Sequence, residues 1–403
     1  MRAHDGQPPF VALGARPMRV LRDAYEAALR RAAPSVGTLD VLCQMALRRE
    51  AVPPWLIAGA SGADLTRMGV SPRRIPAARS VGELVRGPVG VFDPEARAVL
   101  REVEWRVHRR PRRRDRRAGA RGRPAWTHGV HTTVTGALEI ARDAGVPFAN
   151  LCHLVLGVLQ QPACDGTRYR YPHEYARHDA VDRLRDDPAV RRADEPHPDL
   201  DSEMLVLRRG SGPLVDRVAG HVWARMSRIS RLGPLLTAVD REAVRQAVRL
   251  GHGVVGPAHV LLATLTHDAA LDAAGIRVPA DHHSRNRAAQ LLRACGVEAE
   301  PLRVVVAPRG GTDEPPADVL AGQLRDLRPG DPFVGAEVTA AMPRALEVSL
   351  AHRHADTGTS HLLLALLEDE AGGAAAVLRQ LGVDPGTVRA AVEQELRAAP
   401  AAW

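Results

Sequence analysis

One thirteen-residue sequence motif, here called the phrase, occurs twice in this chain in similar form. It reads GPAHVLLATLTHD from Gly256 and GTSHLLLALLEDE from Gly358, so its two histidines, His259 and His361, stand 102 residues apart. In both copies a small residue precedes the histidine and an apolar run follows it. Repetition at a long offset indicates a duplicated structural unit rather than a single catalytic motif. The chain is therefore expected to be built from copies of one small unit.

Two fainter copies of the phrase precede these. NLCHLVLGVL from Asn150 keeps the histidine, at His153, whereas GTLDVLCQMA from Gly37 has Asp40 in its place. A unit of this size buries its apolar face only against a neighbour, so we expect the copies to stack.

Helical patterns surround the two later phrases. Two amphipathic helices are predicted before them, Thr237–His252 and Thr339–His354, each with its threonine as the N-cap. After the last phrase a short helix closes at Gly382, and a final helix runs over 384–396 with its aspartate as the N-cap. Aromatic residues make up 3% of the chain, so the cores must be filled mainly by Leu, Val and Ala. The expected fold class is all-α, with four short helices in each unit.

The later copies resemble a known family. LGHGVVGPAHVLLATL from Leu250, and GTSHLLLALL with the downstream LGVDPG, are similar to the motifs of the Clp N-terminal repeat (Clp R) domain. In Clp unfoldases this domain is the module that binds substrates and adaptors. The resemblance implies tandem four-helix repeats that pair about a pseudo-twofold axis. It is strong over residues 237–398 and fainter in the first half of the chain.

The resemblance also suggests a division into domains. The expected segments are a degenerate repeat pair at 17–165 with an arginine-rich insertion at 105–124, a partly helical linker at 166–214 rich in Arg, Asp and Pro, and a Clp N-terminal domain at 215–398 with repeats at about 237–307 and 338–398.

The positive charge of the chain is concentrated in one segment. Residues 105–124 hold ten arginines and one aspartate, whereas the net charge of the whole chain is +8. A block of like charges is typical of a solvated linker, and base-stacking aromatics are limited to Trp105 and Trp126. A contact with nucleic acid or an acidic partner is the alternative. It would use Arg109, Arg110, Arg112, Arg113, Arg114, Arg116 and Arg117.

The chain contains no lysine, so its 55 residues counted as Lys+Arg are all arginines. A P-loop needs a lysine at the nucleotide phosphates, and Schiff-base chemistry needs a lysine amine. G-x-S-x-G and H-E-x-x-H are absent from the sequence, and no G-x-G-x-x-G follows a predicted strand. Clp ATPases carry Walker lysines in the rings that follow this domain. We therefore expect a free-standing binding module, not an enzyme, and no cofactor.

Metal and membrane signals are weak as well. The cysteines have no C-x-x-C spacing, and the histidines near the phrases and in the polar loop ADHHSRN lack further ligands at matching intervals. We predict no metal site. The N-terminus does not look like a signal peptide and no apolar run is long enough to span a bilayer, so we expect a cytoplasmic protein without membrane contact.

The phrase histidines are expected to be structural, because an imidazole at the start of a buried helix can hydrogen-bond a helix end while its ring packs. For contact with a peptide or partner we assign the histidine, the threonine ahead of it and one leucine of the apolar run in each later copy. These residues are His259, His361, Thr237, Thr339, Leu262 and Leu364.

One departure from the family bears on ligands. In some members an acidic residue just before the phrase histidine helps to bind phosphorylated arginine. Here those positions hold Ala258, Ser360, Cys152 and Leu39. A guanidinium phosphate needs charged, hydrogen-bonding partners, so we expect this binding to be lost. Grooves lined by Leu, Val and Ala would favour apolar peptide segments or a small-molecule ligand.

The function implied by the resemblance is non-enzymatic binding of proteins or peptides. The chain would act as adaptor, regulator or decoy of a Clp protease system, with Clp ATPase or protease components, their substrates or their adaptors as partners. One alternative is a regulatory protein that contacts nucleic acid through residues 105–124. The other is an enzyme with an unrecognised helical site.

Overall fold

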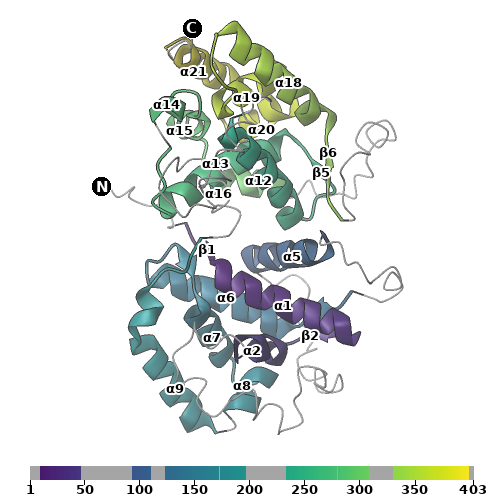
Figure 1. Cartoon of the computed structure of the whole chain (residues 1–403), viewed down its shortest axis with the longest axis vertical. Coiled ribbons are helices and arrows are strands. Elements are labelled where there is room, and N and C mark those ends of the chain that lie inside the picture. Colours follow the sequence, from purple (N-terminus) through teal and green to yellow (C-terminus); the bar gives the residue numbers. More distant parts are fainter. Residues whose placement is uncertain are drawn as a thin grey trace, which may run out of the picture. The chain divides into compact units, whose positions relative to one another are not determined.

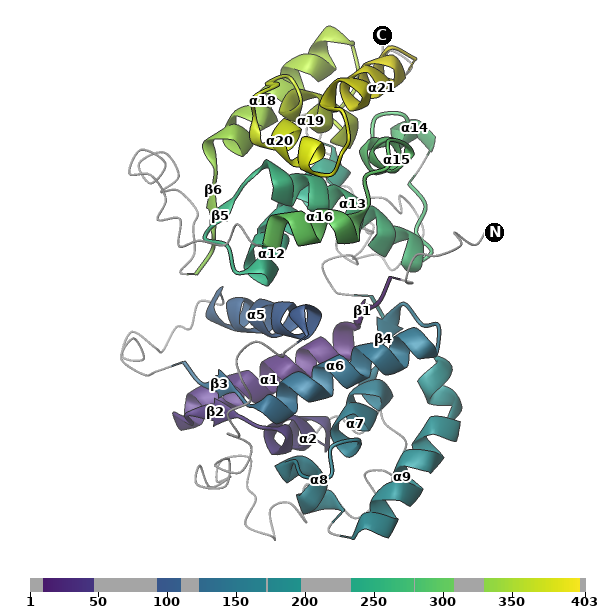
Figure 2. The same ribbon diagram turned by 180° about the vertical axis from the view of Figure 1, so that it is seen from behind.

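The computed structural model describes residues 10–46, 93–109, 123–171, 173–196, 233–278, 280–307 and 330–398. The chain divides into two compact units, 1–197 and 198–403. Helices account for nearly all regular structure in both units (Figures 1 and 2), which confirms the predicted all-α class.

The first unit contains two helix pairs, which coincide with the fainter copies of the phrase. α1 (Ala15–Arg31) leads into α2 (Thr38–Ala46), and α6 (His128–Asp143) leads into α7 (Leu151–Leu159). The other elements are α5 (Pro94–Arg109), α8 (Asp165–Arg170), α9 (Glu174–Asp186), the 3₁₀ helix η4 (Pro188–Arg191), and the short strands β1 (Ala12–Leu13), β2 (Ser35–Val36), β3 (Ala125–Trp126) and β4 (Phe148–Ala149).

The second unit contains the two strong copies. α12 (Pro234–Leu250) leads into α13 (Pro257–Ala273), and α18 (Ala336–Ala351) leads into α19 (Thr359–Leu366). The other elements are α14 (Ala280–His283), α15 (Ala288–Ala294), α16 (Ala299–Val306), α20 (Gly373–Gln380), α21 (Pro385–Ala398), and the strands β5 (Val254–Val255) and β6 (Phe333–Val334). Among the described residues, each repeat of this unit therefore has four main helices, and the first also has the short α14.

Each unit has its own hydrophobic core. Both cores consist mainly of leucine, valine and alanine, as the low aromatic content predicts. None of the described helices combines the length and hydrophobicity needed to cross a lipid bilayer.

Two predicted N-caps were wrong. α12 and α18 begin one turn earlier than expected, with Gly233 and Gly335 as N-caps, so Thr237 and Thr339 lie inside the helices. Local preference favours threonine at a cap, but the position of these helix starts is decided by tertiary pairing of the glycines.

Short lead-in segments exchange hydrogen bonds between the two repeats of each unit. β1 pairs with β4, β2 with β3 and β5 with β6, all in parallel. In every case the segment before the first helix of one repeat lies beside the segment before the phrase helix of the other. The N-cap N–H groups of Gly14, Thr127, Gly233 and Gly335 donate to the carbonyl oxygens of Ala149, Val36, Thr357 and Val255, respectively, at 2.8 to 3.0 Å. The four repeats thus share one reciprocal pairing rule, and sequence periodicity did not predict it.

Residues 166–196 differ from the linker predicted over 166–214. α9 contacts α7 and buries one face in the first core. The chain then returns to the start of α1, where the Asp194 carboxylate accepts the N–H of Arg16 at 2.9 Å. Apolar residues at helical spacing in an otherwise charged segment explain this packing. Residues 197–214 lie outside the described part of the chain.

Helices α6 and α7 approach each other closely. A Cβ atom on Gly157 of α7 would lie 2.3 Å from the carbonyl oxygen of Thr133 in α6. A Cβ on Gly136 of α6 would meet only the side-chain oxygen of Gln160 at 3.3 Å and the Cα of Gly157 at 3.5 Å. Gly157 is therefore required by backbone proximity, whereas a methyl group on Gly136 needs only a small shift of the Gln160 side chain.

Candidate functional site

Each phrase histidine accepts a hydrogen bond from the N-cap residue of its own helix. His259 Nδ1 accepts the N–H of Gly256 at 2.9 Å, and His361 Nδ1 accepts the N–H of Gly358 at 2.9 Å. A helix start leaves backbone N–H groups without partners, and the side chain of the third helical residue can accept one of them. This geometry supports a structural role for both imidazoles.

Each of these histidines is also bonded to a second imidazole. His259 Nε2 lies 2.8 Å from His252 Nδ1, and His361 Nε2 lies 2.7 Å from His354 Nδ1. Since Nδ1 of the phrase histidine accepts a hydrogen bond, we assign its proton to Nε2, which donates to the second ring. Burial, followed by the charge of the second histidine, lowers the pKa of His259 to about 4 and that of His361 to about 3. Both rings are neutral at pH 7.

The first unit builds the same cap with different partners. His153 Nδ1 accepts the N–H of Asn150 at 2.8 Å, and its Nε2 donates to the carbonyl oxygen of Val190 at 2.8 Å. In α2 the Asp40 carboxylate accepts the N–H of Gly37 at 3.0 Å and pairs with Arg31. The residue type changes between copies, but a hydrogen-bond acceptor is kept at this position.

The residues assigned to partner binding do not form one exposed site. Four of them are buried, with exposures of 5, 0, 0 and 6% for His259, His361, Leu262 and Leu364, respectively. Thr237 is half-buried, and Thr339 is exposed with its hydroxyl donating to the Gly335 carbonyl at 3.1 Å. The four buried side chains stabilise the second unit and offer little surface to a partner.

The arginine-rich segment is described only at its start. Arg109 ends α5, and the guanidinium groups of Arg106 and Arg109 lie 5.8 and 4.9 Å from the centre of the Trp105 ring. The other assigned arginines, Arg110, Arg112, Arg113, Arg114, Arg116 and Arg117, lie outside the described residues.

The positions before the phrase histidines offer no charge to a ligand. Ala258, Ser360 and Cys152 are 9, 0 and 2% exposed, respectively, and Leu39 is half-buried. The Ser360 hydroxyl accepts the N–H of Arg287 at 3.1 Å. The side chains at these positions are therefore buried or half-buried and carry no charge.

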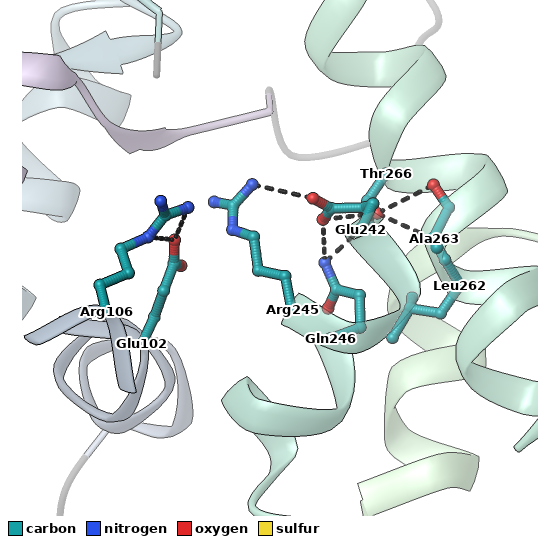
Figure 3. A network of polar contacts seen from close by, with 8 residues as sticks. All are labelled: Glu102, Arg106, Glu242, Arg245, Gln246, Leu262, Ala263 and Thr266. Carbon is teal, nitrogen blue, oxygen red and sulfur yellow. Dashed lines mark hydrogen bonds and ion pairs between the residues drawn. The ribbon is translucent and has the colours of Figure 1, made fainter. Parts of the chain in front are cut away.

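Two buried carboxylates are candidates for proton transfer. Glu242 of α12 accepts from Gln246 at 2.5 Å, from Arg245 at 3.0 Å and from the Thr266 hydroxyl at 3.3 Å (Figure 3). In the first unit Glu102 pairs with Arg106 at 2.8 Å. Both carboxylates are occupied by fixed partners, as in structural networks. Within the described ranges no group of three or more His, Cys, Asp or Glu side chains has an arrangement that could hold a metal ion.

Comparison with known proteins supports the family resemblance at the C-terminal end. Residues 336–402 match the model of the Clp repeat (R) N-terminal domain. This range spans α18 to α21, the complete second repeat of the second unit.

Curated relatives include ATP-binding subunits of Clp proteases and a Clp chaperone. The chain is 29% identical over 201 residues to the "ATP-dependent Clp protease ATP-binding subunit ClpA homolog CD4B, chloroplastic" of Solanum lycopersicum. The aligned region covers 46% of this chain and 18% of the relative. It is 31% identical over 156 residues to "Chaperone protein ClpC1, chloroplastic" of Arabidopsis thaliana, covering 37% and 13%, respectively. The match to the Porphyra purpurea ClpA homolog is 32% identical over 160 residues, covering 38% and 16%. The chain thus spans less than a fifth of the length of these relatives.

Proposed function

We propose that this chain, which carries a Clp repeat at its C-terminal end, is a non-enzymatic module that binds proteins or peptides in a Clp protease system. It would serve as adaptor, regulator or decoy, and its partners would be Clp ATPase or protease components, their substrates or their adaptors. The observation that carries the proposal is the match of residues 336–402 to a Clp repeat. The absence of lysine from the 403 residues argues against a nucleotide-hydrolysing P-loop in this sequence.

Affinity purification of the tagged full chain from its own lysate, followed by mass spectrometry, tests this function. Enrichment of a Clp ATPase, its peptidase or known substrates of that protease over an untagged control is expected. Absence of all Clp components would contradict the proposal. Val304 and Leu350, 63 and 43% exposed, are the first positions to substitute in the second unit, with Tyr175, 84% exposed in the first unit, as the matched control.

A second candidate function rests on the basic run that begins with Arg106 and Arg109 at the end of α5. Trp105, beside which these two arginines lie, is 9% exposed, so its ring is not open to a base, and the contact would be made by arginines to the phosphates of nucleic acid. In that case binding of a labelled oligonucleotide would weaken steeply between 50 and about 200 mM salt. Salt-independent or undetectable binding would exclude it.

Binding of phospho-arginine is expected to be absent or weaker than about 1 mM, because no carboxylate stands before the phrase histidines. Isothermal titration of the full chain with phospho-arginine measures this, with phosphoserine as the control ligand. A dissociation constant in the micromolar range for phospho-arginine alone would overturn the prediction.

A further inference from the structure

The connection after the phrase helix differs in length between the repeats of the second unit. Between α19 and α20 it comprises six residues, 367–372, whereas between α13 and α15 it comprises fourteen, 274–287. The longer connection includes α14 and ends in His282–Arg287, the strap. The insertion therefore belongs to one repeat, and the strap lies against the phrase helix of the other.

The strap covers the first turn of α19 through its backbone and one amide side chain. Ser360 N–H donates to the carbonyl oxygen of Arg285 at 3.0 Å, and Arg287 N–H donates back to the Ser360 hydroxyl at 3.1 Å. Thr359 N–H donates to Asn286 Oδ1 at 3.0 Å. Two consecutive N–H groups of the helix start thus have acceptors in the turn that follows α14.

The guanidinium groups of both strap arginines form ion pairs with carboxylates. Arg285, which is 9% exposed, pairs with Asp356 at 3.0 Å, and Arg287 pairs with Glu395 of α21 at 2.7 Å. His282 adds a contact of 3.0 Å to Asp356. Burial raises the pKa of Asp356, but His282 and Arg285 outweigh it and leave that pKa below its ordinary value. The surface beneath the strap is acidic and accepts two guanidinium groups from arginines separated by one residue.

The equivalent start of α13 is not covered in this way. A Cβ on Gly358 would lie 2.2 Å from the Arg285 carbonyl oxygen, whereas among the described residues a Cβ on the equivalent Gly256 would have only His259 Nδ1 within 4 Å, at 3.9 Å. The two glycines have the same place in the phrase, so their different surroundings come from the strap.

From this geometry we propose that the strap is an internal occupant of a peptide-binding surface formed by Asp356, the first turn of α19 and Glu395, and that this surface accepts peptide segments with two arginines separated by one residue. While the strap is in place, an external Arg-x-Arg segment has to displace it. The inference deepens the proposed function and rests on it, since it names a class of peptide and a contact that limits its access.

Deletion of residues 280–287 provides the first test. It leaves a six-residue connection, 274–279, which is the length used in the other repeat. A labelled peptide with the sequence of the strap, HHSRNR, is expected to bind this variant at least about tenfold more tightly than the intact chain. Replacement of both peptide arginines by glutamine, or Asp356→Asn in the deletion variant, is expected to reduce binding about tenfold or more. Equal binding to both proteins, or indifference to the arginines, would overturn the proposal.

A variant without a deletion covers the case in which the shortened chain does not fold. The full chain with Arg285→Gln and Arg287→Gln keeps the length of the strap but removes its two ion pairs. The HHSRNR peptide is expected to bind this variant more tightly than the wild-type chain, and weaker or equal binding would contradict the proposal.

Amide hydrogen exchange of Gly358→Ala and Gly256→Ala tests the strap independently of any ligand. Gly358→Ala is expected to accelerate exchange at Thr359 and Ser360 at least about tenfold, because the added methyl group displaces the Arg285 carbonyl. Gly256→Ala should leave the first turn of α13 unchanged. Equal protection in Gly358→Ala and wild type would refute the strap contact. This result is independent of the Clp purification, so failure of the proposed function and failure of the strap are distinguishable.

Discussion

Acidification from pH 7 to pH 4 is expected to remove most of the stability of the second unit. His259 and His361 are buried and neutral in the fold, and their pKa values of about 4 and about 3 lie below the value near 6.5 of an unfolded chain. The unfolded state therefore takes up protons first, so stability is complete above about pH 6.5 and falls as pH decreases toward the folded pKa values. Each histidine contributes a loss of about 3 kcal/mol at pH 4. A typical domain has only about 5 to 15 kcal/mol in total.

Urea denaturation at several pH values, followed by circular dichroism and by amide exchange in α13 and α19, measures this loss. His361→Gln should lower the stability at pH 7 and flatten its dependence between pH 4 and 6.5. His283→Gln, which changes an exposed imidazole of the same unit, should leave both unchanged. An unfolding free energy that stays constant from pH 7 to 4 would show that these rings are not held neutral by the fold.

Substitution of Gly157 by alanine is expected to destabilise the first unit by about 3 kcal/mol. Glycine to alanine in an open helix normally gains about 1 kcal/mol, so the sign of the effect is informative. Here the new methyl group would meet the Thr133 carbonyl oxygen at 2.3 Å, and a backbone atom in a packed helix cannot move away cheaply.

Gly136→Ala is the matched control, because it adds the same methyl group on the facing helix. Its closest contact, at 3.3 Å, is the end of the Gln160 side chain, which can rotate. The free energy of unfolding of this variant should equal that of wild type or exceed it by up to about 1 kcal/mol. Equal effects of the two substitutions in chemical denaturation would mean that the α6 and α7 backbones are less closely packed than these distances indicate.

The sequence predicted helices and helix ends well where they depend on residues that are close together in the chain. The repeated phrase located α2, α7, α13 and α19, and the Asp384 cap is confirmed by the bond from Thr387 N–H to its carboxylate at 2.8 Å. Gly382 has the positive φ of 75° predicted for a helix end. These features depend on residues a few positions apart, which the sequence displays directly.

Features that depend on distant residues were missed or misplaced. Thr237 and Thr339 have the side chains of good N-caps, but Gly233 and Gly335 take that role because they bond to the other repeat. The sequence of the strap indicates only a polar loop, since nothing in ADHHSRN shows that its neighbour Arg287 reaches Glu395, 108 residues later. The one available signal was the extra length of this connection relative to the other copy.

The exchanged lead-in segments bear on how such chains are inherited. A repeat that was copied singly would have two lead-in segments without partners, and the N–H of its N-cap would lose its acceptor. A copied pair, in contrast, carries every donor together with its acceptor. A pair of repeats is therefore the smallest piece of this architecture in which every lead-in donor has its acceptor.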